Sequence, residues 1–520
     1  MTATRVVLAE VTATDGVTTE TFRWTDTPIR PFNVGDGARP NAVCDARMIE
    51  GGDVSQDLYA DLSRLEGALG AGDLVISNAD GALSGYRAWR WQDIAIYLGR
   101  AAQDGTPDAF AAWTCILKGR VERPVWEVRT DGPSRLRLSI HDKRADLEQD
   151  VQARLYQGSN VGATGYEGGA DDLKGKPVPL ALGDLTRANI SPPWVNGSTL
   201  TLQLNDGGDY DAETLRDRGA DANMTRDADL TGAAFDAAAP AATHYVRDRT
   251  RGLLKLGGTL GGTVTAGLRG TIGAGGYTAE APALIKRLLE RRGYAGGEIG
   301  ASFGTLAAPA ACGLWLDSPV TYAEAIGQLA RGFAGYVLPD PLGVWQVGRL
   351  AAPAGPAALA IDQYGVRSIE VDDSDALVPA KKITVRYARN YTMMREADLA
   401  GSIIGTARAR ELAEEWRTAV WSSPAVAAAW PTARELTIDT PLVAETDAQG
   451  LADSLGALFG QVRESWRVVV ELDAAALALR LGDDCVQLDY PRQGISGLYR
   501  VIGKRVMAPA RHLVTLRLWG

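Results

Sequence analysis

The segment Arg135-Leu136-Arg137-Leu138-Ser139-Ile140 alternates polar and apolar residues without a break. Successive side chains of a β-strand point to opposite faces, so this period of two places the leucines on one face and the arginines on the other. The pattern predicts a strand with one buried face. The segments around it are also short, rich in apolar residues and bounded by turn residues, and we expect them to be strands as well.

The first 155 residues contain several further segments of this kind. Short strands separated by turn signals at this spacing predict a small barrel or sandwich. The candidate strands are residues 19–24, residues 74–77 before an Asp-Gly pair that favours a tight turn, residues 94–98 ending at Gly99, and residues 113–121.

Helices are indicated where apolar residues recur three and four positions apart. Thr321 and Glu324 form a capping-box pattern, in which each side chain accepts the other residue's main-chain N–H, before a helix that closes at Gly335. The other expected helices are residues 146–156, a segment capped by Thr278 and ending at Gly293, residues 408–421, and a segment after Thr446.

These patterns predict a fold that is mainly β with α+β insertions. At 520 residues the chain is long enough for several domains. We expect a first β-barrel domain over 1–155, a β-rich insertion with long loops over 156–275, a small α+β domain and linker over 276–374, and a second β-barrel domain with helical insertions over 375–520. The strands expected in the last domain are 383–387, 466–470, 485–488, 499–502 and 513–519.

Charge argues against stable nucleic-acid binding. The chain has 54 basic and 64 acidic residues, for a net charge of −10, whereas proteins that hold DNA cluster Lys and Arg against its phosphates. Residues 1–20 lack the apolar block of a signal peptide, and no stretch reaches the roughly 20 apolar residues that span a bilayer. We expect a protein made in the cytoplasm, without stable membrane insertion.

The sequence provides little for a catalytic mechanism. Histidine is the commonest general base, and the chain has three: His141, His244 and His512. A P-loop around Lys176 fails because Ala170 stands where the motif needs Gly, and Pro177 where it needs Ser or Thr. We therefore expect no enzyme, and no catalytic, cofactor-binding or metal-binding residues.

The order of segments resembles the hub proteins at the baseplate or tail tip of long-tailed, siphophage-like bacteriophages. Each mark is short, and together they follow one another over nearly the whole chain. They are residues 74–81 (LVISNADG), 117–121 (LKGRV), 139–148 (SIHDKRADLE), 173–183 (LKGKPVPLALG), 261–270 (GGTVTAGLRG), 382–391 (KITVRYARNY) and 514–520 (VTLRLWG).

The resemblance implies a homotrimer that caps a sixfold tail tube. A ring of three meets a ring of six when each subunit presents two similar surfaces, because an interface patch repeats with the symmetry operator. Two tube-type barrels, over roughly 1–155 and 375–520, would provide them. The implied partners are tail-tube or distal-tail proteins, other baseplate and central-fibre proteins, and a tape measure protein.

The resemblance also implies a place and a task. The protein would sit at the virion tail tip and gate the channel through which DNA passes, without specific binding, during ejection. Acidic side chains along that channel would keep DNA from adsorbing. Relatives often continue into a fibre or an enzymatic domain, and we expect another protein to supply it here or the domain to be absent.

Two other functions stay open: a receptor- or glycan-binding adhesin, and a cell-wall hydrolase that uses two carboxylates. Aromatic rings stack on sugars, but they also fill cores and interfaces, which is the role we expect here. The tryptophans concerned are Trp24, Trp89, Trp91, Trp345, Trp466 and Trp519.

The four cysteines raise one further question. Some phage tail-tip proteins hold an iron–sulfur cluster on four cysteines, and cluster ligands normally include closely spaced pairs. Here the cysteines lie far apart in the sequence, so we expect four buried thiols that act as small apolar groups. They are Cys44, Cys115, Cys312 and Cys485.

Overall fold

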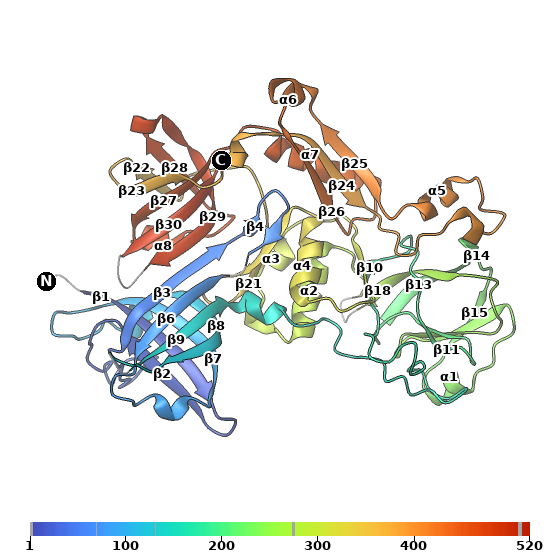
Figure 1. Cartoon of the computed structure of the whole chain (residues 1–520), viewed down its shortest axis with the longest axis horizontal. Helices are drawn as coiled ribbons and strands as arrows, with labels where there is room; N and C mark the ends of the chain where they lie inside the picture. Colours follow the sequence, from blue (N-terminus) through green and yellow to red (C-terminus); the bar gives the residue numbers. More distant parts are fainter. Residues whose placement is uncertain (1–3, 69, 130–131, 208, 273–275, 508–511) are drawn as a thin grey trace.

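The computed structural model describes residues 4–68, 70–129, 132–207, 209–272, 276–507 and 512–520 (Figure 1). The fold is mainly β, with several sheets and with helices concentrated in the middle and C-terminal regions, as the sequence predicts. Within the described ranges, no helix is both long and apolar enough to cross a membrane.

The largest sheet contains strands from both ends of the chain. Its order is β2-β1-β7-β8-β9-β6-β3-β29-β30-β27-β23, with β28 beside β29 and β22 beside β28. The N-terminal strands are β1 (Thr4–Thr14), β2 (Thr19–Thr25), β3 (Met48–Asp57), β6 (Ala71–Ser77), β7 (Arg90–Ala101), β8 (Thr114–Glu127) and β9 (Arg135–Asp142). The C-terminal strands are β22 (Leu359–Asp362), β23 (Val366–Val371), β27 (Ser465–Glu471), β28 (Cys485–Tyr490), β29 (Ile495–Met507) and β30 (Leu513–Trp519).

Strand β9 shows why this sheet has one buried face. Leu136, Leu138 and Ile140 are fully buried, and the polar residues between them are partly exposed, as the alternation predicts. Strand β7 runs beyond its expected end at Gly99. A Cβ at Gly99 would lie 2.0 Å from the indole ring of Trp113, so the glycine makes room for that ring while the strand continues.

Two five-stranded sheets form the β-rich region that follows (green in Figure 1). The first has the order β14-β13-β18-β10-β19, and the second has the order β11-β12-β17-β16-β15 with the short helix α1 (Ala233–Ala237) beside it. Their strands are β10 (Leu180–Asp184), β11 (Trp194–Asn196), β12 (Thr201–Gln203), β13 (Asp209–Asp217), β14 (Ala220–Asp221), β15 (Thr225–Asp229), β16 (His244–Asp248), β17 (Leu253–Leu256), β18 (Val264–Ile272) and β19 (Gly313–Leu316).

Residues 146–156 do not form the expected helix. A short 3-10 helix covers Lys143–Leu147, and the chain is then extended because its main chain bonds to distant segments. The N–H of Val151 donates to Val320 O, and that of Tyr156 to Lys176 O, both at 2.9 Å. The spacing of Leu147, Val151 and Leu155 is therefore coincidental, and Leu155 is exposed.

A small α+β unit packs at the centre of the molecule (Figure 1). It comprises α2 (Ala281–Arg292), α3 (Ser302–Thr305), α4 (Tyr322–Arg331) and the hairpin of β20 (Gly335–Pro339) and β21 (Trp345–Arg349). The capping box of α4 is confirmed: Thr321 Oγ1 accepts the N–H of Glu324 at 3.2 Å, and a Glu324 carboxylate oxygen accepts the N–H of Thr321 at 3.1 Å.

The ends of these helices differ slightly from the sequence prediction. Helix α2 begins after Glu280, not at Thr278, because residues 279–280 are held extended by pairing with residues 311–312. It ends at Gly293, as expected, with a left-handed φ of 109°. Helix α4 ends at Arg331, since Ala334 turns the chain into β20 before Gly335.

A separate three-stranded sheet lies above this unit in Figure 1, with the order β25-β24-β26. Its strands are β24 (Ala380–Tyr387), β25 (Arg417–Ser422) and β26 (Arg434–Asp439). Helices α6 (Pro424–Ala429) and α7 (Glu445–Phe459) contact this sheet, and α5 (Ala407–Ala413) lies between β24 and β25 in the sequence. The expected helix over 408–421 is wrong in its second half. All of residues 417–422 pair with residues 382–387 of β24, and this pairing overrides the helical pattern.

The expected boundary at residue 375 separates strands that the structure pairs. β22 lies beside β28 and β23 beside β27, although β22 and β23 precede that boundary. Strand β24, expected in the second barrel, belongs to the separate sheet instead. Strands β4 (Tyr59–Asp61) and β5 (Glu66–Gly67) form a further small hairpin, and helix α8 (Ala474–Ala478) precedes β28.

We expect Thr321→Ala to weaken α4 by about 1 kcal/mol, because it leaves N–H groups of the first turn without an acceptor. Hydrogen exchange of the α4 amides measures this loss. The matched control is Thr305→Ala, whose hydroxyl donates to main-chain carbonyls of α3 instead of accepting from an N-terminal turn. Equal exchange of α4 in the wild type and Thr321→Ala would contradict the role of the cap.

Candidate assembly interface

Strand β29 joins the two ends of the chain into one sheet. Along one edge it pairs first with β28, from Ile495 to Arg500, and then with β3, from Gly503 to Met507. Along its other edge it pairs with β30. Figure 1 shows β3 (blue) next to this red C-terminal region. A single strand thus fixes the N-terminal strands against the C-terminal strands.

Ion pairs cross this junction at both ends of the β3–β29 ladder. Arg505 bonds to Asp53 at 3.2 Å, and Arg517 on β30 bonds to Asp57 at 2.9 Å and to the buried Asp372 at 2.8 Å. The main-chain carbonyl of Asp57 accepts a further bond from the guanidinium of Arg144, also at 2.9 Å. The end of β3 is therefore bonded to three other segments of the chain.

Gly503 marks the point where β29 changes partner. A Cβ at this position would lie 2.0 Å from the Asp57 carboxylate and 2.9 Å from Cδ of Arg517. The glycine therefore leaves room for the Asp57–Arg517 ion pair to cross the strand. Its φ is not in the left-handed region, so the requirement is for space and not for backbone freedom.

Two buried cations on β29 are held by main-chain carbonyls. Arg500 donates to the carbonyls of residues 351, 352, 482 and 483, at 2.8–2.9 Å. Lys504 donates to Leu477 O and Leu479 O, both at 2.9 Å, at the end of α8. Burial lowers the pKa of Lys504 to about 8. The sequence analysis missed both residues; the available signal was two cations, Arg500 and Lys504, four positions apart within one predominantly apolar strand.

A hollow lies beside the junction, with a volume of about 710 Å³. Side chains of β3, β6, β8, β9 and β29 line it. The acidic lining residues are Glu50, Asp53, Asp73 and Glu122, and the basic ones are Arg137 and Arg505, with His141 bonded to Glu122 at 2.7 Å. A surface with charges of both signs suits contact with a protein partner better than uniform binding of a polyanion.

The strand tryptophans lie mostly in the core. Trp24, Trp91, Trp345 and Trp519 are buried, as expected, and Trp89 and Trp466 are partly buried against the same cluster. In the N-terminal sheet Phe22 stacks with Trp24 at a centroid distance of 5.3 Å, and Trp91 is tilted against Phe22 at 5.2 Å and against Trp24 at 5.9 Å. These rings therefore fill the core and present no row of aromatic faces.

The cysteines are free thiols. Cys44, Cys312 and Cys485 are buried and Cys115 is partly buried. Burial raises the pKa of Cys44 and Cys115 to about 11 and that of Cys312 to about 12, so these three stay protonated at neutral pH. Over the described part of the chain, no three His, Cys, Asp or Glu side chains gather as a metal site would require.

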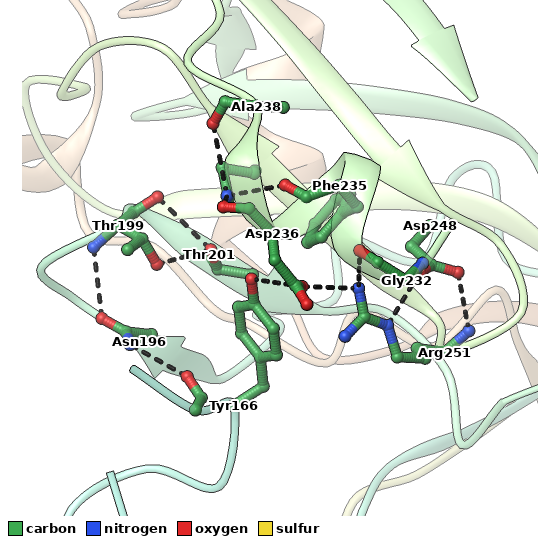
Figure 2. A network of polar contacts seen from close by, with 12 residues as sticks. Tyr166, Asn196, Thr199, Thr201, Gly232, Phe235, Asp236, Ala238, Asp248 and Arg251 are labelled. Carbon is green, nitrogen blue, oxygen red and sulfur yellow. Dashed lines mark hydrogen bonds and ion pairs between the residues drawn. The ribbon is translucent and has the colours of Figure 1, made fainter. Parts of the chain in front are cut away.

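A polar network in the β-rich region holds α1 against β16 and β17 (Figure 2). Asp236 accepts from Tyr166 at 3.0 Å and from Arg251 at 2.8 Å, and Arg251 also donates to Asp248 at 2.7 Å. The buried Lys255 donates to the carbonyls of residues 235, 236 and 238. Because these cations bond to groups inside the network, we interpret it as a structural link.

The similarity of this chain to known proteins is structural. No protein-family model matches the chain, and no curated protein matches it. Several of the solved structures that resemble it are described as tail proteins. One is the tail protein from Neisseria meningitidis MC58, with 11% identity, a TM-score of 0.43 and coverage of 98% of this chain and 96% of that one.

A second similar structure is the 43 kDa tail protein of prophage MuSo2 from Shewanella oneidensis, with 11% identity, a TM-score of 0.40 and 98% of each chain covered. A third is the E. coli c3393 protein, a type VI secretion component described as similar to the T4 bacteriophage tail proteins gp27 and gp5. Its identity is 8%, its TM-score 0.31, and the match covers 91% of this chain and 73% of that one. A prophage tail protein is thus among the solved structures that this chain resembles, at low sequence identity.

We expect Gly503→Ala to destabilise the junction by about 1–3 kcal/mol, because the new methyl group displaces the Asp57 carboxylate from Arg517. Hydrogen exchange of the β3 and β29 amides reports this locally. The control is Gly450→Ala in α7, where the added methyl group meets open space and the change is expected to be neutral or slightly stabilising. Unchanged exchange at the junction would contradict the proposed crowding.

Lys504 gives a pH-dependent prediction. Its pKa of about 8 lies below the ordinary value of 10.5, so the unfolded chain binds more protons between these two pH values. The free energy of unfolding therefore gains a positive slope with pH over this window. Urea unfolding at several pH values should show that slope in the wild type and in the exposed-site control Lys286→Met, but not in Lys504→Met. Equal slopes in all three proteins would refute the assignment.

Proposed function

We propose that the protein is a structural, non-enzymatic hub of a phage tail tip or baseplate, which caps the sixfold tail tube as a homotrimer. The observation that carries the proposal is the β3–β29 junction. It builds two sheet regions, one from each end of the chain, into a single surface. The order of sequence marks along the chain supports the same assignment.

The sixfold symmetry of a tail tube would require the junction to be firm. If three copies close a ring, each contributes its N-terminal and its C-terminal sheet region, and six such regions surround the axis. We propose that residues 1–155 form one tube-facing unit, and that the other is built from β22, β23 and the strands after residue 465. A firm junction would keep the two units at a fixed spacing, as a sixfold partner requires.

Strand β23 is a candidate contact between neighbouring subunits. It ends the hydrogen-bonded path of the large sheet, and Val371 at its end is 49% exposed. An edge strand with open main-chain groups is a template for pairing with another chain, and proteins seldom leave one uncovered. We propose that a neighbouring copy or a tail-tube protein covers it.

The net charge of −10 supports a second element of the proposal. We propose that acidic side chains face the channel, so that DNA passes during ejection without adsorbing. The hub would open this channel when the tail contacts a cell. A net basic lining around the axis of an assembled ring would refute this element, but not the hub itself.

Glycan binding has less support as an alternative, because most strand tryptophans are buried. Trp194 and Trp430 are the half-exposed tryptophans that an adhesin could use, each 37% exposed. Saturable binding of the isolated chain to a glycan array, lost in Trp194→Ala or Trp430→Ala, would favour the adhesin. A cleared band in a zymogram of bacterial cell wall would favour a hydrolase.

The proposal predicts three copies of this chain for each ring of six tail-tube subunits. Quantitative mass spectrometry of intact tails measures the ratio, and cryo-electron microscopy places the chain at the tail tip. Gly503→Ala should lower the number of tails that carry the hub, and Gly450→Ala should leave it unchanged. Six copies per ring, or absence of the chain from tails, would overturn the proposal.

A further inference from the structure

A cationic cavity of about 320 Å³ lies where three parts of the molecule meet. Its walls come from β19, from the end of α4, and from the ends of β24 and β26 together with the loop before β25. Helix α4 and β26 are in contact, and Figure 1 shows both at the centre of the molecule. The lining side chains that matter are Gln328, Arg331, Arg386, Arg389, Trp416 and Tyr391.

Two of the three arginines are fixed by carboxylates. Arg386 donates two hydrogen bonds to the carboxylate of Asp439, and Arg389 forms an ion pair with Glu415 at 3.1 Å. Both guanidinium groups lie over the indole ring of Trp416, each 5.4 Å from its centroid. These contacts hold the two cations in place and add cation–π attraction.

The third arginine, Arg331, has no such partner. Among the described residues its guanidinium makes one weak bond, from Nε to Gly327 O at 3.4 Å, and no carboxylate lies within ion-pair distance. Its neighbour Gln328 also lines the cavity, and no described residue bonds to its amide. Three cations therefore face two carboxylates, and the excess positive charge lies next to free space and an unused amide donor.

We propose that this cavity binds a small oxyanion, a phosphate or a carboxylate, with Arg331 as its main cation. The planar fork of a guanidinium matches the paired oxygens of both anions. The volume lies at the lower end of the range for small-ligand sites. A bound anion would neutralise the excess charge and link α4, β19 and the β25-β24-β26 sheet, so it would also stiffen the contact between these parts.

Arg331 also lies in the last turn of α4, where a cation is favourable without any ligand because of the helix dipole. That structural role predicts a loss of stability in an Arg331 variant, but no change in its response to an anion. Binding measurements therefore separate the two roles, and stability measurements alone do not.

The test is isothermal titration calorimetry of the full chain with inorganic phosphate and, separately, with acetate, at constant ionic strength set by sodium chloride. We expect saturable binding of at least one of the two anions. Arg331→Gln should weaken it by about 10- to 100-fold, the effect of losing a charge-assisted bond. Arg349→Gln, which removes an exposed arginine bonded to Ala307 O outside the cavity, should bind like the wild type.

Arg331→Lys keeps the charge at the end of α4 but loses the two-pronged geometry, so its binding should be intermediate. It also replaces Arg331→Gln as the test if that variant does not fold. Binding of acetate alone assigns the site to carboxylates, and binding of phosphate assigns it to phosphate-class anions. The proposal is overturned if neither anion binds saturably, or if the Arg331 variants bind as the wild type does.

Discussion

The pairing of β3 with β29 is the contact on which the arrangement of both ends of the chain depends. These strands lie more than 400 positions apart in the sequence, yet they exchange main-chain hydrogen bonds over residues 53–57 and 503–507. Because a β-ladder fixes register as well as distance, the N-terminal strands cannot slide or tilt against the C-terminal ones without breaking it. The proposed hub would need this kind of rigidity to keep two tube-facing surfaces at a fixed spacing.

Buried cations also fix the conformation of the loops around the junction. Arg500 and Lys504 donate to main-chain carbonyls, as Lys255 does in the β-rich region. A buried charge is costly unless its donors are used, so each of these side chains selects one loop conformation in which the carbonyls converge on it. The end of α8 and the segment at residues 351–352 are positioned in this way. The cavity beside α4 differs, because among the described residues the guanidinium of Arg331 there makes one weak bond, to Gly327 O.

Local patterns predicted much of the secondary structure. The alternation in 135–140 and the capping box at Thr321 each depend on residues within one strand or one helical turn, and both were confirmed. The wrong helices, at 146–156 and in the second half of 408–421, share one cause. In both segments, main-chain bonds to residues distant in the sequence outweigh a helical spacing of apolar side chains. The candidate interface could not be predicted, since Gly503 and Asp57 gain their roles only when β3 and β29 meet.

The sequence by itself determined a mainly β protein with little catalytic equipment and an excess of acidic charge, because composition and short periodicities are local properties. It also carried the succession of marks that resembles phage tail hubs. The tertiary structure alone decided which strands share a sheet, where β29 changes partner and which arginines come together at the cavity beside α4. These features depend on contacts between residues far apart in the chain, and neither periodicity nor composition encodes such contacts directly.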